Sequence, residues 1–566
     1  MMHHAGRTRR LTLSGLSLLG LTACQGLIAT RPSIDPPPTT ARDGGRTDAS
    51  LDGSLGPPLP AFVPAAATLH RLTQIQYQNS VRQLLGATVR APTDLELDTQ
   101  LYGFANIGAA EVTVSPRAAE QFEAAGYNVA GQIFGDPAAR MTLVRCAPST
   151  IEDPCVRAFV QRFARSAWRR PLSTMELDRW VNVARTAARA YGDTQKGIEY
   201  AVAGLLQSPN FLFRVERGET DPSDPSRKRY TSYEMASRLS FLLWSSTPDE
   251  ALLDAASRGE LLSADSVRAQ ARRMLSDPRA HQALLGFFRE HFKLDRIAPQ
   301  TRDAMAYPLW SPALVRSMVR EFEQIVDDTV LTRDGDLRDL LSTRTTFLDS
   351  NLARLYGVPG SFTDTPTRYE WPANSPRMGL LTTAAVLSNF AHAVTTSPTL
   401  RGKFVRQFLL CQTIDPPPPE VTTDLPPPLP GTVQTLRQRL EELHLQRPSC
   451  AACHERMDPI GFGLEHFDAI GAYRTTDNTL PVNARGDLDG RAFANARELS
   501  LAVRTHPAMV SCFARNVYRY ATGHVEREGE EASIAGITQA VSSQGYRFSV
   551  LLTELAASDG FRYAAQ

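Results

Sequence analysis

Several signatures of well-known chemistries are missing from this sequence of 566 residues. It has no G-x-S-x-G elbow, no H-E-x-x-H zinc motif and no phosphate-binding G-x-x-x-x-G-K-[ST] loop, and it shows no fixed-period repeat. Its 61 basic and 60 acidic side chains nearly cancel, so we expect no basic surface for nucleic acid. Because no segment reaches about 18 uninterrupted apolar residues, the mature chain is not expected to span a membrane.

Cysteine is also scarce, with 7 residues, yet two of them lie in Cys450-Ala451-Ala452-Cys453-His454. C-x-x-C-H is the pattern through which exported proteins attach haem: each thiol forms a thioether to the porphyrin, and the histidine ligates the iron. The alternatives are a zinc half-site, a thioredoxin-like redox pair and coincidence. Zinc would need a second Cys/His pair at ligand spacing, and none follows. A redox pair would sit at a strand-to-helix junction, which is not evident. The motif therefore predicts one haem c, anchored by Cys450 and Cys453, with His454 as the proximal ligand.

The second ring nitrogen of a ligating histidine usually donates to a carboxylate or a carbonyl group. The Asp458 carboxylate and the Pro459 carbonyl both lie at a suitable distance along the sequence. Alternatively, Asp458-Pro459 forms a turn that ends a short helix after His454. Both interpretations of Asp458-Pro459, as a partner of His454 and as a turn, remain open, and they are compatible with one another.

The sixth ligand of the iron is not given by the motif. Met457 lies three residues from His454, so on a helix both side chains face the same way and Met457 is an unsuitable distal ligand. A distal methionine would suit electron transfer, whereas an open site would admit peroxide or oxygen. The distal candidates are His392 and His444 first, then Met509, with His466 and His506 also considered.

The N-terminus predicts export. Arg7, Arg9 and Arg10 precede an apolar stretch from Leu11 to Leu21 of signal-peptide length. Leu21-Thr22-Ala23-Cys24 resembles a bacterial lipoprotein box, which implies cleavage before Cys24 and lipidation of its thiol. Gln25 lacks the aspartate that retains such proteins at the inner membrane, so the resemblance implies an outer-membrane or surface location. The alternative is an ordinary secretory signal.

The remaining chain divides by composition. Residues 1–23 form the signal peptide, and 24–67 a disordered tether rich in Pro, Gly and Asp. Helical domains are expected at 68–145, 146–218 and 219–340, a haem-bearing domain at 341–490 and a helical domain at 491–566. The fold class is mainly α, with a C-terminal domain like cytochrome c.

Apolar periodicity predicts the individual helices. We expect Ser173 to cap one of them, with Glu176 completing a capping box. The segment 364–375 is expected to be a loop. Helices are expected at 73–85, 156–168, 198–206, 233–244, 283–292 and 432–445.

Beyond Cys24 and the haem pair, four cysteines remain, an even number that fits an oxidising compartment. Cys146 and Cys155 are close enough to clasp one loop. Cys411 and Cys512 would then join the segment before the haem motif to the helix after it. The alternative is four buried thiols.

Several stretches resemble a multi-domain family of planctomycetes and myxobacteria that carries a planctomycete-type cytochrome C domain. The resemblance covers nearly everything from about residue 68 onward and implies a helical, exported c-type haem protein, but no substrate, because the activity of the family is largely undefined. The matching stretches are Arg71–Thr73, Tyr77–Gly86, Arg169–Leu172, Leu206–Leu212, Tyr233–Asp249, Thr396–Pro398, Arg401–Val405, Cys450–His454 and Met457–Asp468.

Three functions are compatible with these features. The first is a lipid-anchored electron carrier that docks an unidentified redox partner protein at the cell envelope. The second is a peroxidase-like or oxygenase-like haem enzyme with an open distal site, to which Glu465, Asp468 or Arg474 would contribute polar groups unless they form a structural network. The third is a surface binding or scaffold protein with an auxiliary haem, since a haem domain needs only about 100 residues.

Overall fold

The computed structural model describes residues 60–416 and 431–566. The described chain is 57% helix and 9% strand, which confirms the mainly α prediction. In these two ranges, no helix combines the length and the apolar character needed to cross a membrane. The predicted signal peptide, the lipidation site Cys24 and the tether as far as residue 59 lie outside the described residues.

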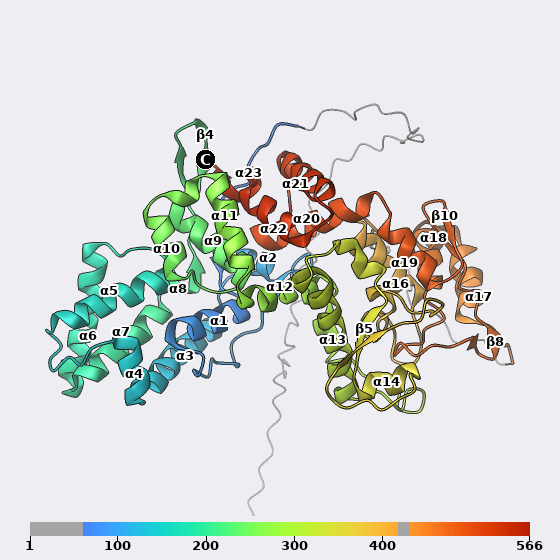
Figure 1. Cartoon of the computed structure of the whole chain (residues 1–566), viewed down its shortest axis with the longest axis horizontal. Helices are drawn as coiled ribbons and strands as arrows, with labels where there is room; N and C mark the ends of the chain where they lie inside the picture. The colour runs from blue at the N-terminus through green and yellow to red at the C-terminus, as the bar shows by residue number, and fades with distance from the viewer. Residues whose placement is uncertain (1–59, 417–430) are drawn as a thin grey trace, which may run out of the picture. The chain divides into compact units, whose positions relative to one another are not determined.

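The first hydrophobic core is built from the helices that follow β1 (His70–Arg71) (Figure 1). Its buried residues run from Leu72 to Leu212 and include Phe241 of a later helix. The two predicted domains at 68–145 and 146–218 therefore share one core. The helices of this part, all of which except α2 contribute to this core, are α1 (Gln74–Leu85), α2 (Ala105–Glu111), α3 (Pro116–Phe134), α4 (Pro137–Val144), α5 (Pro154–Trp168), α6 (Thr174–Tyr191), α7 (Thr194–Gln207) and α8 (Pro209–Leu212).

The second core takes in nearly all of the remaining helices and also Phe104 and Ile107, from the start of α2. Phe104 stacks on Phe287 and meets Tyr520 edge-on, so α2 joins this core rather than that of its neighbours in sequence. The helices are α9 (Ser232–Trp244), α10 (Glu250–Ser257), α11 (Ala264–Leu275), α12 (Pro278–His291), α13 (Pro312–Val326), α14 (Ser350–Tyr356), α15 (Ala384–Asn389), α16 (Pro398–Phe404), α17 (Leu436–Leu440), α18 (Pro448–Phe462), α19 (Ala496–Arg504), α20 (Ala508–Thr522), α21 (Glu531–Ser543), α22 (Phe548–Ala557) and α23 (Asp559–Arg562). Short 3-10 turns at η1 (Glu260–Leu262), η2 (Leu294–Arg296), η4 (Leu337–Leu341), η5 (Leu380–Thr382) and η8 (Glu528–Glu530), and π-helical turns at η3 (Asp327–Thr332), η6 (Val405–Leu409) and η7 (Glu441–Leu445), connect them.

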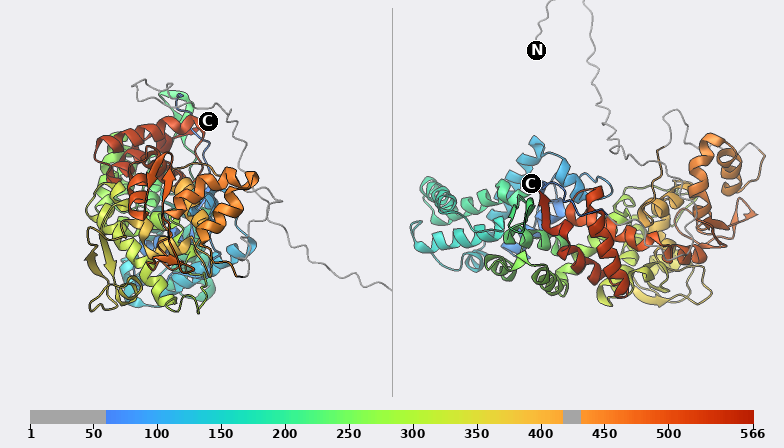
Figure 2. Two further views of the ribbon diagram at one scale, coloured as in Figure 1. Left: turned by 90° about the vertical axis from the view of Figure 1, so that its right-hand side faces the viewer. Right: turned by 90° about the horizontal axis from the view of Figure 1, so that it is seen from above.

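Small antiparallel sheets fasten distant parts of the chain together. β1 pairs with β2, with His70 opposite Arg214. The last strand pairs with β4, with Tyr563 opposite Arg229, so the C-terminus lies beside β4 (Figures 1 and 2). The remaining strands are β2 (Phe213–Arg214), β3 (Glu219–Asp221), β4 (Asp224–Arg229), β5 (Thr345–Leu348), β6 (Thr367–Glu370), β7 (Thr476–Asp477), β8 (Leu480–Pro481), β9 (Gly486–Leu488), β10 (Arg491–Phe493) and β11 (Tyr563–Ala565).

Local sequence signals explain most helix boundaries. Ser173 caps α6, and its hydroxyl and the Glu176 carboxylate form the predicted capping box. Thr73 and Gln76 form the same arrangement at the start of α1, which ends at Gly86. In both cases the side chains satisfy backbone N–H groups that the helix leaves unpaired. The helices predicted at 73–85, 156–168, 198–206, 233–244 and 283–292 are confirmed as α1, α5, α7, α9 and α12.

Two predictions need correction. The helix expected over 432–445 begins at Leu436, because Thr435 caps it, and its last turn is π-helical. The loop expected at 364–375 contains β6, whose backbone pairs with β5. This strand carries exposed polar side chains, so its pairing leaves no alternating apolar pattern in the sequence.

Two disulfide bonds, Cys146–Cys155 and Cys411–Cys512, lie within the described residues. The first closes the loop between α4 and α5. The second joins the end of η6 to α20, 101 residues further along the chain. Cys450 and Cys453 are present as thiols.

Candidate functional site

The candidate site is built on α18, which carries the C-x-x-C-H residues in its first half. Cys450, Cys453 and His454 are spaced three and four positions apart, so the helix presents them on one face. All three side chains are half-buried. The helix continues through Pro459 to Phe462. The alternative prediction, that Asp458-Pro459 forms a turn that ends the helix, is therefore wrong.

Helix α18 is held against α16 by direct backbone contact. A β-carbon on Gly402 would lie 1.8 Å from the carbonyl oxygen of Met457, and one on Gly461 would lie 1.9 Å from that of Pro398. From another part of the chain, a β-carbon on Gly486 of β9 would lie 2.0 Å from the carbonyl oxygen of Pro459. Only glycine permits this spacing, and the resulting contacts support α18 on both sides of its internal proline. Tertiary packing thus overrides the tendency of proline to end a helix.

This close packing places α16 opposite the histidine of the motif. The Nδ1 of His454 lies 2.8 Å from Oδ2 of Asp458, and the Thr399 hydroxyl donates to Oδ1 of the same carboxylate at 2.7 Å. The Asp458 side chain is 0% exposed. Of the two partners that the sequence left open for His454, the structure thus shows the Asp458 carboxylate. With Nδ1 occupied, Nε2 is the atom of His454 left to bind a metal.

His444, on the π-helical turn η7 before α18, contacts His454 directly. The ring centres are 4.2 Å apart, and Nδ1 of His444 is buried without a hydrogen-bond partner. Burial lowers the pKa of His444, and the nearby His454 lowers this pKa further. Together with Asp458 these rings offer ligand atoms within 4.8 Å of one another.

The position of His444 bears on its predicted role as sixth ligand. Two imidazoles on opposite sides of one metal ion, with each nitrogen about 2 Å from it, have ring centres about 6 Å apart. The observed separation is 4.2 Å. His444 therefore serves as the sixth ligand only if the two rings move about 2 Å apart on haem binding.

The other distal candidates occupy different surroundings. His392 is exposed on a turn, where its N–H donates to the carbonyl of Thr395. Met509 is 4% exposed on α20, within the second core. His466 donates from Nδ1 to the carbonyl of Arg474, and His506 pairs with Asp489. Of these candidates, His444 is the one that the structure shows against His454.

The polar residues that follow α18 form a structural network around Arg401. The guanidinium of this side chain, 1% exposed, donates to the carbonyls of Leu464 and Phe467 and to the Glu465 carboxylate. Arg474 binds the other oxygen of Glu465. Burial lowers the pKa of Arg401 to about 10 and raises that of Glu465, against the opposing effect of their pairing.

Arg401 also donates to the carbonyl of Asp468, whose carboxylate accepts from the N–H groups of Ile470 and Ala472. Glu465, Asp468 and Arg474 therefore form a structural network, which was the alternative to a role as polar groups at an open distal site. Sequence reasoning did not assign a role to Thr399 or Arg401. Arg401 lies in a stretch marked only by the family resemblance, Arg401–Val405, and Thr399 lies between that stretch and Thr396–Pro398.

Five family profiles match the chain in succession, and each is described as a protein of unknown function. They are DUF1587 at 70–135, DUF1595 at 155–216, DUF1592 at 230–358, DUF1588 at 377–477 and DUF1585 at 489–561. Their succession supports a multi-domain family of unknown function. Both α16 and α18 lie within the DUF1588 match. Comparison with curated proteins and with solved structures gives no match.

Proposed function

We propose that this chain is an exported, lipid-anchored protein that carries one covalent haem on α18 and transfers electrons at the cell envelope. The observation that carries the proposal is the donor set on one helix face. Two thiols and an imidazole stand at C-x-x-C-H spacing, and the Nδ1 of the imidazole is already engaged by a buried carboxylate. Haem, when bound, supplies one-electron redox chemistry at its iron.

The residues of α18 fit this group. Cys450 and Cys453 would hold the porphyrin through thioethers, and both are half-buried thiols. His454 would ligate the iron through Nε2. Because Asp458 and Thr399 fix the orientation of the ring, the site is arranged for a metal before one binds. The location is proposed from the lipoprotein-like sequence that ends at Cys24, and the electron donor and acceptor are redox partner proteins.

The second candidate is a haem enzyme, and one observation favours it. Asp458 is a full carboxylate, which makes His454 a more basic ligand than a backbone carbonyl would. Strong electron donation to the iron is the property that peroxide-cleaving haem proteins use. A low-spin spectrum with negligible peroxide turnover would support the electron carrier, and a high-spin resting state with turnover would support the enzyme.

The deciding experiment is production of the chain together with a haem-attachment system in a bacterial periplasm. The proposal expects a coloured protein whose mass exceeds that of the polypeptide and lipid by one haem. The matched control is C450S/C453S, which removes the thioether anchors and leaves His454 in place. A wild-type protein that is colourless, with no added mass, would contradict the proposal.

A second measurement concerns the tuning of the site. D458N replaces the buried carboxylate with a neutral amide of the same shape, so the midpoint potential should rise. D487N removes the same charge from an exposed position on strand β9 and should leave the potential unchanged. A potential that is equal in D458N and wild type would show that Asp458 does not act on the iron through His454.

A further inference from the structure

A large cleft lies outside the α18 site, in the N-terminal part of the described chain. It has a volume of about 1140 Å³. Its walls come from the segment before β1, the turn after α5, the α8–β2 region and the start of α9. No residue of α16 or α18 lines it.

The rim of this cleft carries more positive than negative charge. Arg217 is exposed and Lys228 half-buried, and neither side chain forms an ion pair within residues 60–416 and 431–566. Arg170, also on the rim, is instead paired with Glu176. The Glu234 carboxylate, which also lines the cleft, accepts from the backbone N–H groups of Arg217 and Gly218. It is the one acidic side chain on the rim, so it offsets only one of the two unpaired cations.

Beneath the rim, the buried charges are unequal in number. Arg169, Arg214 and Arg238 are 4%, 4% and 3% exposed, and the carboxylate among them is Glu216, 4% exposed. Glu216 forms ion pairs with both Arg214 and Arg238. Glu530, which lines a small cavity together with Arg238, is bound by His524 and Tyr518.

Arg169 is left with neutral partners. Its guanidinium donates to backbone carbonyls, those of Asn210 and Phe213 among them. Burial lowers its pKa to about 9, and the charge of Arg214 adds to this effect. Excess positive charge in a buried cluster is costly, and an anion at the surface above it offsets that cost. Arg169 and Glu216 both line the cleft, so this part of the buried cluster faces it.

The walls of the cleft also present rings and apolar side chains. Trp168, Phe213 and Tyr233 line it, together with Leu69 and Val215, of which the last two are 52% and 38% exposed. We propose that the cleft binds an organic oxyanion, a carboxylate or phosphate carried on an aromatic or apolar body. The oxyanion meets Arg217 and Lys228, and the body packs against the ring-lined wall.

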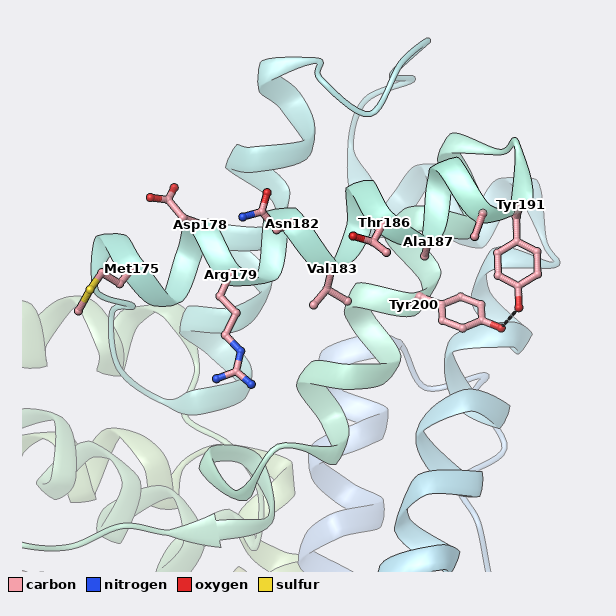
Figure 3. Close-up of a pocket in the computed structure, with 10 residues that line it drawn as sticks. Met175, Asp178, Arg179, Asn182, Val183, Thr186, Ala187, Tyr191 and Tyr200 are labelled. Carbon is pink, nitrogen blue, oxygen red and sulfur yellow. Dashed lines mark hydrogen bonds between the residues drawn. The ribbon is translucent and has the colours of Figure 1, made fainter.

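A second hollow on the same part of the chain shows what is distinctive about this cleft. It lies on the outer face of α6, where Met175, Asp178 and Arg179 precede the hydrogen-bonded hydroxyl groups of Tyr191 and Tyr200 (Figure 3). Its one acidic and one basic side chain balance, and no buried arginine lies among its lining residues. Arg179 is exposed and therefore serves as the matched control for Arg217.

The test is isothermal titration calorimetry on the whole exported chain, with three probes at low salt. Phenyl phosphate has the oxyanion and the ring, inorganic phosphate has the oxyanion alone, and benzyl alcohol has the ring alone. We expect phenyl phosphate to bind more tightly than either partial probe. R217A/K228A should weaken its binding about tenfold or more, because each charged hydrogen-bond partner contributes at about that scale. R179A should leave binding unchanged.

Four results would overturn the proposal. The first is no detectable binding of phenyl phosphate, and the second is equal binding of phenyl phosphate to R217A/K228A and wild type. The third is that inorganic phosphate binds as tightly as phenyl phosphate, and the fourth is that benzyl alcohol binds as tightly as phenyl phosphate. The third would mean that the rings take no part, and the fourth that the charge takes none. None of these outcomes depends on haem, so the electron-transfer proposal stands or falls separately.

Discussion

The contact between α16 and α18 can be tested by placing one methyl group inside it. In G402A the new β-carbon would lie 1.8 Å from the carbonyl oxygen of Met457. A tolerable contact is about 3 Å or more, so the two helices would have to separate by more than about 1 Å. The obstructing atom belongs to the backbone, so no side-chain rotation relieves the clash.

The expected cost combines three effects. Overpacking of this kind costs about 1–3 kcal/mol. Separation of the helices also stretches the hydrogen bond from Thr399 to the buried Asp458, now 2.7 Å, and a hydrogen bond to a charged group contributes about 1.5–3 kcal/mol. In the opposite direction, replacing a helical glycine with alanine stabilises the helix by about 1 kcal/mol. The free energy of unfolding should therefore fall by about 2–5 kcal/mol in G402A.

Urea unfolding followed by far-UV circular dichroism measures this change. The matched control is G536A, in α21, where a β-carbon meets nothing within 4 Å. That variant should gain about 0.5–1 kcal/mol, since alanine favours a helix over glycine. If G402A were as stable as wild type to within about 0.5 kcal/mol while G536A gained stability, the backbone contact would not be what holds α18 in place.

Three further predictions concern other parts of the chain. S173A removes the capping box with Glu176 and should lower the free energy of unfolding by about 1 kcal/mol, measured by urea titration. An unchanged free energy of unfolding in S173A would contradict this, even if variants of Glu176 were destabilised. Burial raises the pKa of Glu321 to about 7 from an ordinary value of 4.5, so the folded state binds its proton more tightly than the unfolded state does. Stability should therefore fall as the pH rises from about 4.5 to 7, by up to about 3 kcal/mol from this group, and E321Q should flatten that part of the profile. C411S/C512S opens a loop closed over 101 residues and should lower stability by up to about 5 kcal/mol, whereas equal melting of oxidised and reduced wild type would count against any role for this bridge.

Features set by neighbouring residues were predictable from the sequence. The capping box at Ser173 and the start of α1 at Thr73 each depend on side chains three positions apart, so the pattern contains all the information needed. The face shared by Cys450, Cys453 and His454 follows in the same way from helical spacing.

Features set by packing between distant segments were not predictable. Asp458-Pro459 has the composition of a turn, and it is helical because glycines about 60 residues earlier and 30 residues later let other backbone segments support it. The choice of Asp458 over a carbonyl as partner of His454 likewise depends on Thr399, on another helix. The same holds for His444, which lies against His454, whereas His392 lies on an exposed turn.

The bridge between Cys411 and Cys512 has a consequence for maturation, because the two haem-motif thiols lie within the loop that it closes. Joining Cys411 to either of those thiols would close less than half that length of chain, which costs less conformational entropy. The bridge found in the folded protein is thus not the one that random collisions in the unfolded chain would favour. If Cys450 and Cys453 attach haem as proposed, attachment before oxidation would remove both competing thiols and leave Cys411 and Cys512 to pair with each other.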